Sequence, residues 1–158
     1  MKRLSRFRFA LTGRALFLII SSASVLLCIG LGRADETDQQ IAMLCPAVFW
    51  SALLLEVVFV CYATRLRRQL EKRFSGLEYP KGIRSIGKRA DVLITDAVGL
   101  LAVAALVVLL LRHIPTSAIQ YLLLFVIVLT VRLHLMLTGK NHVFGNYTRH
   151  HKAQLKPG

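Results

Sequence analysis

The chain has 158 residues, of which 55% are hydrophobic, and its formal net charge is +13. A soluble domain of this size has about 45–50% apolar residues, arranged in alternation with polar ones. Here the apolar residues form four blocks, each of the roughly 20 residues that a helix needs to cross the ~30 Å hydrocarbon core of a bilayer. The sequence therefore predicts one integral membrane domain and excludes a sizeable soluble one.

The chain begins with a basic leader, residues 1–13, in which lysine and arginine residues lie among aromatic ones. We expect this leader to lie along the membrane surface, with Phe7 and Phe9 in the interface and the arginines against anionic lipid. The first span follows, from about residue 15 to 31. A cleaved signal peptide is the alternative for this segment, although the apolar run is long and the sequence around Gly30 is a poor cleavage site.

The second span covers about residues 41–64 and carries Glu56 well inside it. The basic segment 65–90 follows, and we expect a cytoplasmic loop whose first part continues the helix. The glycines of this loop do not form a phosphate-binding loop, because no strand precedes them and the G-x-x-x-x-G-K-[ST] pattern is absent.

The third span covers about residues 92–111, with Asp96 in its second turn. It has no aromatic residue and several small ones, which favours a helix packed inside a bundle. The fourth span, about residues 118–137, carries Arg132 and His134 before its apolar run ends. The tail, residues 138–158, is basic and rich in histidine, and we expect it to be only partly ordered.

The distribution of positive charge predicts the topology. The leader through Arg14, the central loop and the tail hold 18 lysine and arginine residues, and the two outer loops hold two. By the positive-inside rule, this bias predicts an all-α transmembrane four-helix bundle with both termini in the cytoplasm. It also accounts for the net charge without a nucleic-acid partner. Six basic residues at the predicted membrane boundary are expected to contact anionic lipid headgroups: Arg65, Arg67, Arg68, Lys88, Arg89 and Lys140.

Three of the charged residues inside spans fall at one depth. At 1.5 Å per residue, Glu56, Asp96 and Arg132 all lie ~10–13 Å from the predicted cytoplasmic edge. An isolated charge there costs at least ~2.5–3.5 kcal/mol. Since one guanidinium can hold two carboxylates, we expect a Glu56–Arg132–Asp96 cluster. His134 belongs to the same group of intramembrane charges, but it lies about 200° further round the helix from Arg132 and is expected to face another neighbour or the headgroups.

Three roles remain open for this intramembrane charge cluster. It can fix the register of the helices, or it can line a polar pocket for a headgroup, an ion or a proton. In the third alternative the arginine reaches the membrane interface and the two carboxyl groups are protonated. One carboxylate in excess of the arginine favours a raised pKa for one carboxyl group.

No cofactor, metal site or catalytic residue is expected. Within the spans His134 has no histidine partner for a haem, and the tail histidines lack a cysteine or carboxylate to complete a zinc site. The cysteines form no C-x-x-C motif; they are expected to be small buried hydrophobes, with a bridge between Cys28 and Cys45 as the alternative. The chain also lacks the sequence motifs of hydrolases and nucleotide-binding enzymes.

The end of the fourth span, residues 134–142, reads HLMLTGKNH. It resembles an H-x-x-x-N-G-K-N-aromatic string that closes the last helix of small four-span membrane proteins of Gram-positive bacteria, from which it departs at Thr138 and His142. The resemblance implies a multi-pass protein of a bacterial plasma membrane and implies no particular activity.

Two functions of different class are compatible with this sequence. The first is a non-enzymatic accessory subunit, regulator or assembly factor whose helices pack on a larger membrane partner. The second is a small oligomeric transporter or lipid-handling protein that uses the intramembrane Glu/Asp/Arg cluster.

Overall fold

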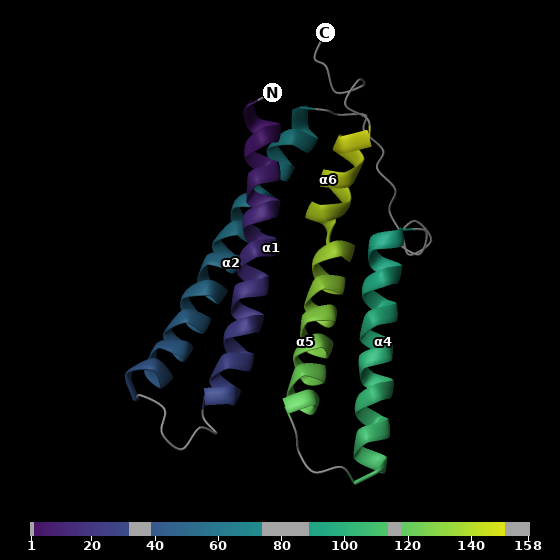
Figure 1. Ribbon diagram of the computed structural model, residues 1–158. Helices are drawn as coiled ribbons and strands as arrows, with labels where there is room; N and C mark the ends of the chain where they lie inside the picture. The colour runs from purple at the N-terminus through teal and green to yellow at the C-terminus, as the bar shows by residue number, and fades with distance from the viewer. Residues whose placement is uncertain (1, 32–38, 74–88, 114–117, 151–158) are drawn as a thin grey trace.

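The computed structural model describes residues 2–31, 39–73, 89–113 and 118–150. Within these ranges the chain forms five helices and no strand. In chain order (Figure 1) they are α1 (Lys2–Leu31), α2 (Gln39–Arg73), α4 (Ala90–Leu111), α5 (Ala118–Thr138) and α6 (Lys140–His150). The four longer helices are long and apolar enough to cross a membrane, so the predicted all-helical, four-span architecture is confirmed.

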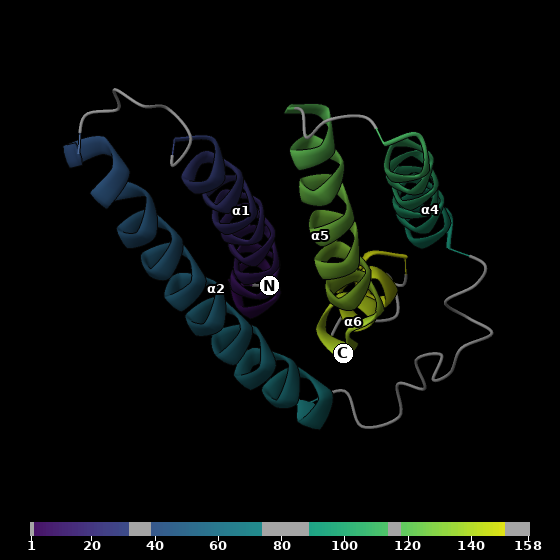
Figure 2. The ribbon, with the colours of Figure 1, turned by 90° about the horizontal axis from the view of Figure 1, so that it is seen from below.

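The four long helices lie in the order α2, α1, α5, α4 across the molecule (Figure 2). α1 packs along α2, α5 packs along α4, and the two pairs meet where α5 contacts α1. The start of α1, the end of α2 and the whole of α6 lie at one end of the molecule (Figure 1). α5 therefore has different neighbours on its two sides, with α1 and α2 on one side and α4 on the other.

Each helix pair is held close by a glycine. A Cβ atom added to Gly13 of α1 would lie 2.6 Å from the ring of Phe59 on α2. A Cβ atom added to Gly99 of α4 would lie 2.8 Å from the hydroxyl oxygen of Thr130 on α5. Both distances are too short for a methyl group, so these glycines set the spacing of the helices, as small residues do between membrane helices.

The third span differs from its prediction. The sequence predicts a helix packed inside the bundle, whereas α4 lies at the edge and buries only Val92 and Ala102. Small residues signal close packing only on the face that carries them, and Gly99 supplies that face toward α5. The large apolar residues on the other faces, Leu100 and Leu101 among them, are exposed on the surface of the protein.

The prediction that the basic leader lies along the membrane surface is wrong. The first helix begins at Lys2 and continues through the leader into the first span without a break. Phe7 is fully buried and meets Phe144 of α6 edge-on, with ring centroids 5.5 Å apart. Phe9, in contrast, is exposed. The small core at this end of the molecule joins three helices and consists of Phe7, Ala10, Ala63, Leu66, Leu70 and Phe144. The leader is helical because one of its faces is apolar and packs in this core.

The tail, which is expected to be only partly ordered, forms α6 as far as His150; residues 151–158 lie outside the described part. Gly139 separates α6 from α5, and its carbonyl accepts hydrogen bonds from the amides of His142 (3.0 Å) and Val143 (3.1 Å). The buried face of α6 is formed by Asn141, Phe144, Gly145 and Thr148. Packing against α1 and α2 therefore stabilises a helix whose sequence has little helical propensity.

Candidate functional site

Arg132 of α5 binds residues of two other helices. Its Nη2 atom forms a hydrogen-bonded ion pair with Oε2 of Glu56 on α2. Its Nη1 atom donates to the hydroxyl oxygens of Ser21 and Ser22 on α1, each at 2.8 Å. The structure thus brings Glu56 and Arg132 together, as the depth argument predicts, and adds two serines that the sequence reasoning did not assign.

The hydroxyl groups of Ser21 and Ser22 are oriented so that their oxygen atoms can accept hydrogen bonds from an arginine. The hydroxyl groups of Ser21 and Ser22 donate to the carbonyl oxygen of Leu18, at 3.1 and 2.8 Å. Their oxygen lone pairs are then available to a guanidinium, which has donors and no acceptor. Both serines are buried, and their small size lets α5 approach α1 closely.

Asp96 does not join Arg132. Its Oδ1 atom lies 2.6 Å from Nδ1 of His134. The predicted Glu56–Arg132–Asp96 cluster is therefore wrong in its third member, and the four intramembrane charges form two pairs. The cause is the phase of α5: residues 132 and 134 lie about 200° apart on a helix, and α4 lies on the side of α5 opposite to α1 and α2. The prediction that His134 faces a different neighbour from Arg132 agrees with this arrangement.

A groove of about 440 Å³ lies between α4 and α5 beside the Asp96–His134 pair. Thr95 and Thr130 add hydroxyl groups to this part of the groove, and most of the remaining lining is aliphatic. The side chains of Asp96 and His134 are 42% and 40% exposed, so this pair is more open than the Arg132–Glu56 pair.

A second arginine, Arg14 of α1, lies near Arg132 and was missed by the sequence reasoning. It interacts electrostatically with Glu56 and with Arg132. Its Nη1 atom also lies 3.9 Å from the position of a Cβ atom at Gly139. The sequence argument assigned Arg14 to the basic leader and used it only for topology. Its spacing of seven residues from Ser21, which places both on one helix face, is the signal that could have found it.

We call Arg14, Ser21, Ser22, Glu56 and Arg132 the inner site. It holds two guanidinium groups and one carboxylate, so its charge balance is positive. The sequence had predicted the reverse, one carboxylate in excess, because it counted Asp96 and did not count Arg14. The Nε atom of Arg14 is buried and has no hydrogen-bond partner in the part of the chain that the structure describes.

Further buried guanidinium nitrogens lie toward the end of the molecule that carries α6. The Nε and Nη2 atoms of Arg8 and the Nε atom of Arg67 have no partner among the described residues. Arg67 Nη1 donates to Glu71 Oε1 at 3.2 Å, and Asn141 Nδ2 donates to Thr64 Oγ1 at 2.9 Å. Glu56, Thr64, Arg67 and Glu71 repeat at helical spacing on one side of α2. A polar stripe, interrupted at Val60, therefore runs along α2 from this end to the inner site.

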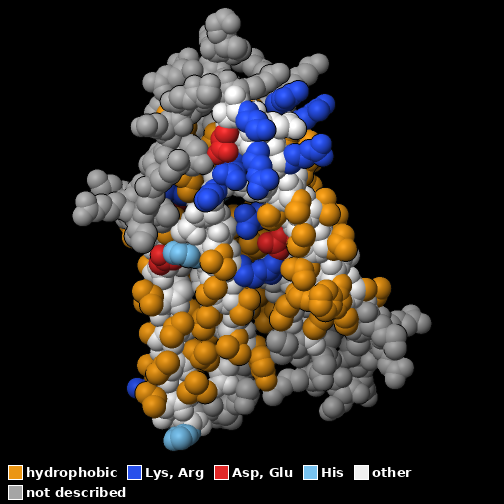
Figure 3. Space-filling model, turned by 180° about the vertical axis from the view of Figure 1, so that it is seen from behind, with side chains coloured by type: hydrophobic (Ala, Val, Ile, Leu, Met, Phe, Trp, Pro, Cys, Tyr) orange, Lys and Arg blue, Asp and Glu red, His pale blue; other side chains and the backbone are white. Residues whose placement is uncertain are grey.

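The arrangement of these charges is visible on the surface. Figure 3 shows lysine and arginine side chains gathered at the end of the molecule that carries the N-terminus of α1. Hydrophobic side chains cover most of the helices below, and red and blue side chains also show in a hollow between them. Charged groups therefore reach into the apolar part of the molecule from one end.

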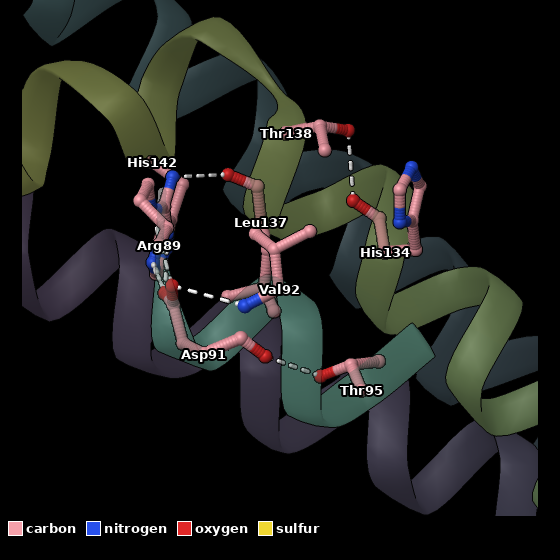
Figure 4. A network of polar contacts seen from close by, with 8 residues as sticks. All are labelled: Arg89, Asp91, Val92, Thr95, His134, Leu137, Thr138 and His142. Carbon is pink, nitrogen blue, oxygen red and sulfur yellow. Dashed lines mark hydrogen bonds and ion pairs between the residues drawn. The ribbon is translucent and has the colours of Figure 1, made fainter. Parts of the chain in front are cut away.

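A third polar cluster joins the start of α4 to α6 and to the end of α5 (Figure 4). Arg89 pairs with Asp91 and donates from Nη1 to the carbonyl oxygen of Leu137 at 2.9 Å, while Asp91 Oδ1 accepts from the amide of Val92 at 3.0 Å. His142 Nε2 lies 3.8 Å from Asp91 Oδ2. Burial and then the Arg89 charge lower the pKa of His142 below its ordinary value, against the opposing effect of Asp91.

The six residues predicted to contact lipid headgroups have different surroundings. Arg65, Arg68 and Lys140 are exposed, and their contact with lipid stays a prediction. Arg67 and Arg89 bind protein groups, and their side chains are only 11% and 18% exposed. Lys88 lies outside the described residues.

Within the described ranges, no three histidine, cysteine or acidic residues are grouped as a metal site would require. Cys28, Cys45 and Cys61 are free; Cys45 is buried and Cys61 is exposed. Comparison with protein-family models, with curated proteins and with solved structures finds no match to this chain.

Proposed function

We propose that this chain is a multi-pass protein of a bacterial plasma membrane that handles anionic lipid and holds the charged headgroup at the inner site. The observation that carries the proposal is the charge balance of this site. Inside the membrane-spanning helices Arg132 pairs with Glu56, and Arg14 feels the charge of both residues. The Nε donor of Arg14 is buried without a described partner.

The chemistry of the inner site suits an oxyanion. A cation in the hydrocarbon region is costly unless it is paired, and the guanidinium group matches the oxygens of a phosphate in geometry and charge. Glu56 neutralises part of the positive charge, which limits the affinity for an anion and allows release. Binding that is selective and reversible is what a lipid-handling protein needs.

The proposal includes the orientation of the chain. The excess of lysine and arginine in the leader, central loop and tail favours a cytoplasmic location for the end of the molecule that carries α6. The test is labelling with a membrane-impermeant maleimide in a variant without native cysteines. Ser5→Cys should react only after the membrane is opened, and Arg112→Cys should react in intact cells; the reverse pattern would refute this orientation.

Two conservative variants test the inner site, because we expect them to change lipid occupancy in opposite directions. Glu56→Gln removes the carboxylate that competes with a bound anion, so it should raise the occupancy by phosphatidylglycerol. Arg14→Gln removes a cation and should lower it. A charge is worth about 1 kcal/mol near a membrane surface, so each change in apparent affinity should be about fivefold. The measurement is native mass spectrometry of the purified protein titrated with phosphatidylglycerol.

The control is Arg112→Gln, which removes a cation just after α4, at the end of that helix away from the inner site. It should leave lipid occupancy unchanged. If Glu56→Gln and Arg14→Gln lower thermal stability but neither changes lipid occupancy, the inner site only fixes helix register and the proposed function fails.

A second candidate function, an accessory subunit of a larger membrane complex, is favoured by the position of α4. This helix packs mainly on α5, and large apolar side chains cover its other faces. Size-exclusion chromatography in mild detergent separates the candidates. A stoichiometric complex with another membrane protein supports the accessory role, and a monomer or homo-oligomer that retains anionic lipid supports lipid handling.

A further inference from the structure

A basic recess lies on the last turns of α2, on a different face from the one that carries Glu56. Its volume is about 370 Å³, and three cations line it: Arg65, Arg68 and Lys72. Thr64 borders it on one side, and Val60 and Cys61 lie at the end toward the middle of the helix. No acidic residue is among the described residues that line it.

The three cations lie on one side of α2, because residues 65, 68 and 72 follow the spacing of three and four that aligns side chains on a helix. Arg67 lies on another face, where it pairs with Glu71. None of the three cations forms an ion pair with another described residue, and all three are exposed. Their positive charge is therefore available to a ligand.

The same face of α2 becomes apolar toward the middle of the helix. Cys61, Val57 and Leu54 continue the row of Arg65 at helical spacing, and all three are exposed. A basic recess with an apolar strip below it matches a phospholipid, whose phosphate lies at the membrane boundary and whose acyl chains lie along the helix. The polar part lies near the end of the segment that is apolar enough to span the membrane, Leu44–Lys72.

The recess also adjoins the polar stripe that leads to the inner site. Thr64 borders the recess, and its hydroxyl group accepts a hydrogen bond from Asn141 of α6. Thr64 lies two turns of α2 from Glu56, with Val60 between them at one turn from each.

We infer that this recess binds the phosphate group of an anionic phospholipid, as an outer seat from which the headgroup reaches the inner site. The inference rests on the proposed function, because the outer seat supplies the lipid that the inner site holds. Arg65, Arg68 and Lys72 provide the cations, and Cys61, Val57 and Leu54 contact the acyl chains.

The test compares two triple variants of equal charge in the full chain. R65Q/R68Q/K72Q removes the cations of the recess, and R3Q/R6Q/R149Q removes three exposed cations elsewhere at the same end of the molecule. Each protein is titrated with phosphatidylglycerol, with phosphatidylcholine and with inorganic phosphate, and bound ligand is counted by native mass spectrometry. The recess variant should lose roughly 100-fold in affinity for phosphatidylglycerol, and the control variant should lose less than about fivefold.

Equal losses in the two triple variants would overturn the inference, because they would show attraction by net charge alone. Inorganic phosphate that binds as tightly as phosphatidylglycerol would assign the recess to a free anion and would also overturn it. The proposed function is refuted by a different result from the one that refutes the outer seat. If R65Q/R68Q/K72Q loses lipid while Glu56→Gln and Arg14→Gln change nothing, the outer seat stands and the inner site has no part in lipid binding.

Discussion

Arg132 and His134 lie two residues apart on α5 and bind carboxylates on opposite sides of the helix. Arg132 pairs with Glu56 of α2, and His134 pairs with Asp96 of α4. α5 is therefore the central element of the bundle, with one ion pair joining it to α2 and a second joining it to α4. The two pairs should make separate contributions to stability.

Removal of Arg132 should be severely destabilising. Arg132→Ala leaves Glu56 without its ion-pair partner and two serine hydroxyls without their donor, and the loss of one partner of a buried pair costs about 3–5 kcal/mol. Arg132→Lys should recover only part of the loss, because an ammonium group cannot reproduce the fork of the guanidinium. The measurement is the melting temperature in detergent, followed by fluorescence-detected size-exclusion chromatography.

The double variant Arg132→Gln with Glu56→Gln is the control for that prediction. It keeps two polar side chains that can bond to each other and carries no net charge in the pair. It should be more stable than Arg132→Ala, because it leaves no unpaired charge; equal melting temperatures of the two variants would show that an unpaired Glu56 carboxylate costs nothing.

The Asp96–His134 pair should couple α4 to α5 and leave the Arg132 pair unaffected. A double-mutant cycle of Asp96→Asn and His134→Gln should give a coupling energy of about 1 kcal/mol, as expected for residues in contact. A cycle of Asp96→Asn with Arg132→Lys should give none within about 0.5 kcal/mol. Coupling in the second cycle would mean that the two pairs are not independent.

Gly99→Ala should loosen the contact between α4 and α5. The added Cβ atom would lie 2.8 Å from Thr130 Oγ1, and this hydroxyl group already donates toward Val126 and Ile127. Overpacking of this kind costs about 1–3 kcal/mol. Thr130→Ala in the same chain removes the nearest atom and should restore part of the melting temperature, whereas the exposed Leu101→Ala should change it little.

Stability should depend on pH through His142, which is half-buried near Arg89 and Asp91. Its pKa is lowered in the folded protein, so below the ordinary histidine pKa of about 6.5 the unfolded chain binds the proton more readily. Folding is then disfavoured as the pH falls. The melting temperature of the native chain should fall more between pH 7 and pH 5 than that of His142→Gln. Parallel curves for the two proteins would exclude this effect.

Phe144→Ala should detach α6. Phe144 is fully buried against Phe7, and truncation of a buried phenylalanine costs about 3–5 kcal/mol. Hydrogen exchange should then accelerate in α6 and in the first two turns of α1, while α4 keeps its protection. Uniform acceleration throughout the chain would indicate global unfolding instead.

The sequence predicts the four spans because an apolar run of sufficient length has few alternatives to a membrane helix. It also predicts that Glu56 and Arg132 meet, since depth along a helix follows from residue counting. It does not predict the partner of Asp96, which depends on the side of α5 that α4 occupies, and no residue count contains that information.

Arg14 was missed for a related reason, since a basic residue at the start of a span satisfies the topology rule whether it faces water or the bundle. α6 was missed because its apolar positions are few and its order depends on α1 and α2.

The contact between Phe7 and Phe144 has a consequence for how the protein is made. The seventh residue leaves the ribosome long before residue 144 exists, so this apolar part of α1 has no complete partner surface during most of synthesis. The core at this end closes only after all four spans have entered the bilayer and α6 has been translated. A ribosome-bound chain stopped before residue 140 should therefore leave the first turns of α1 accessible to protease, because α6 completes the burial of this part of α1.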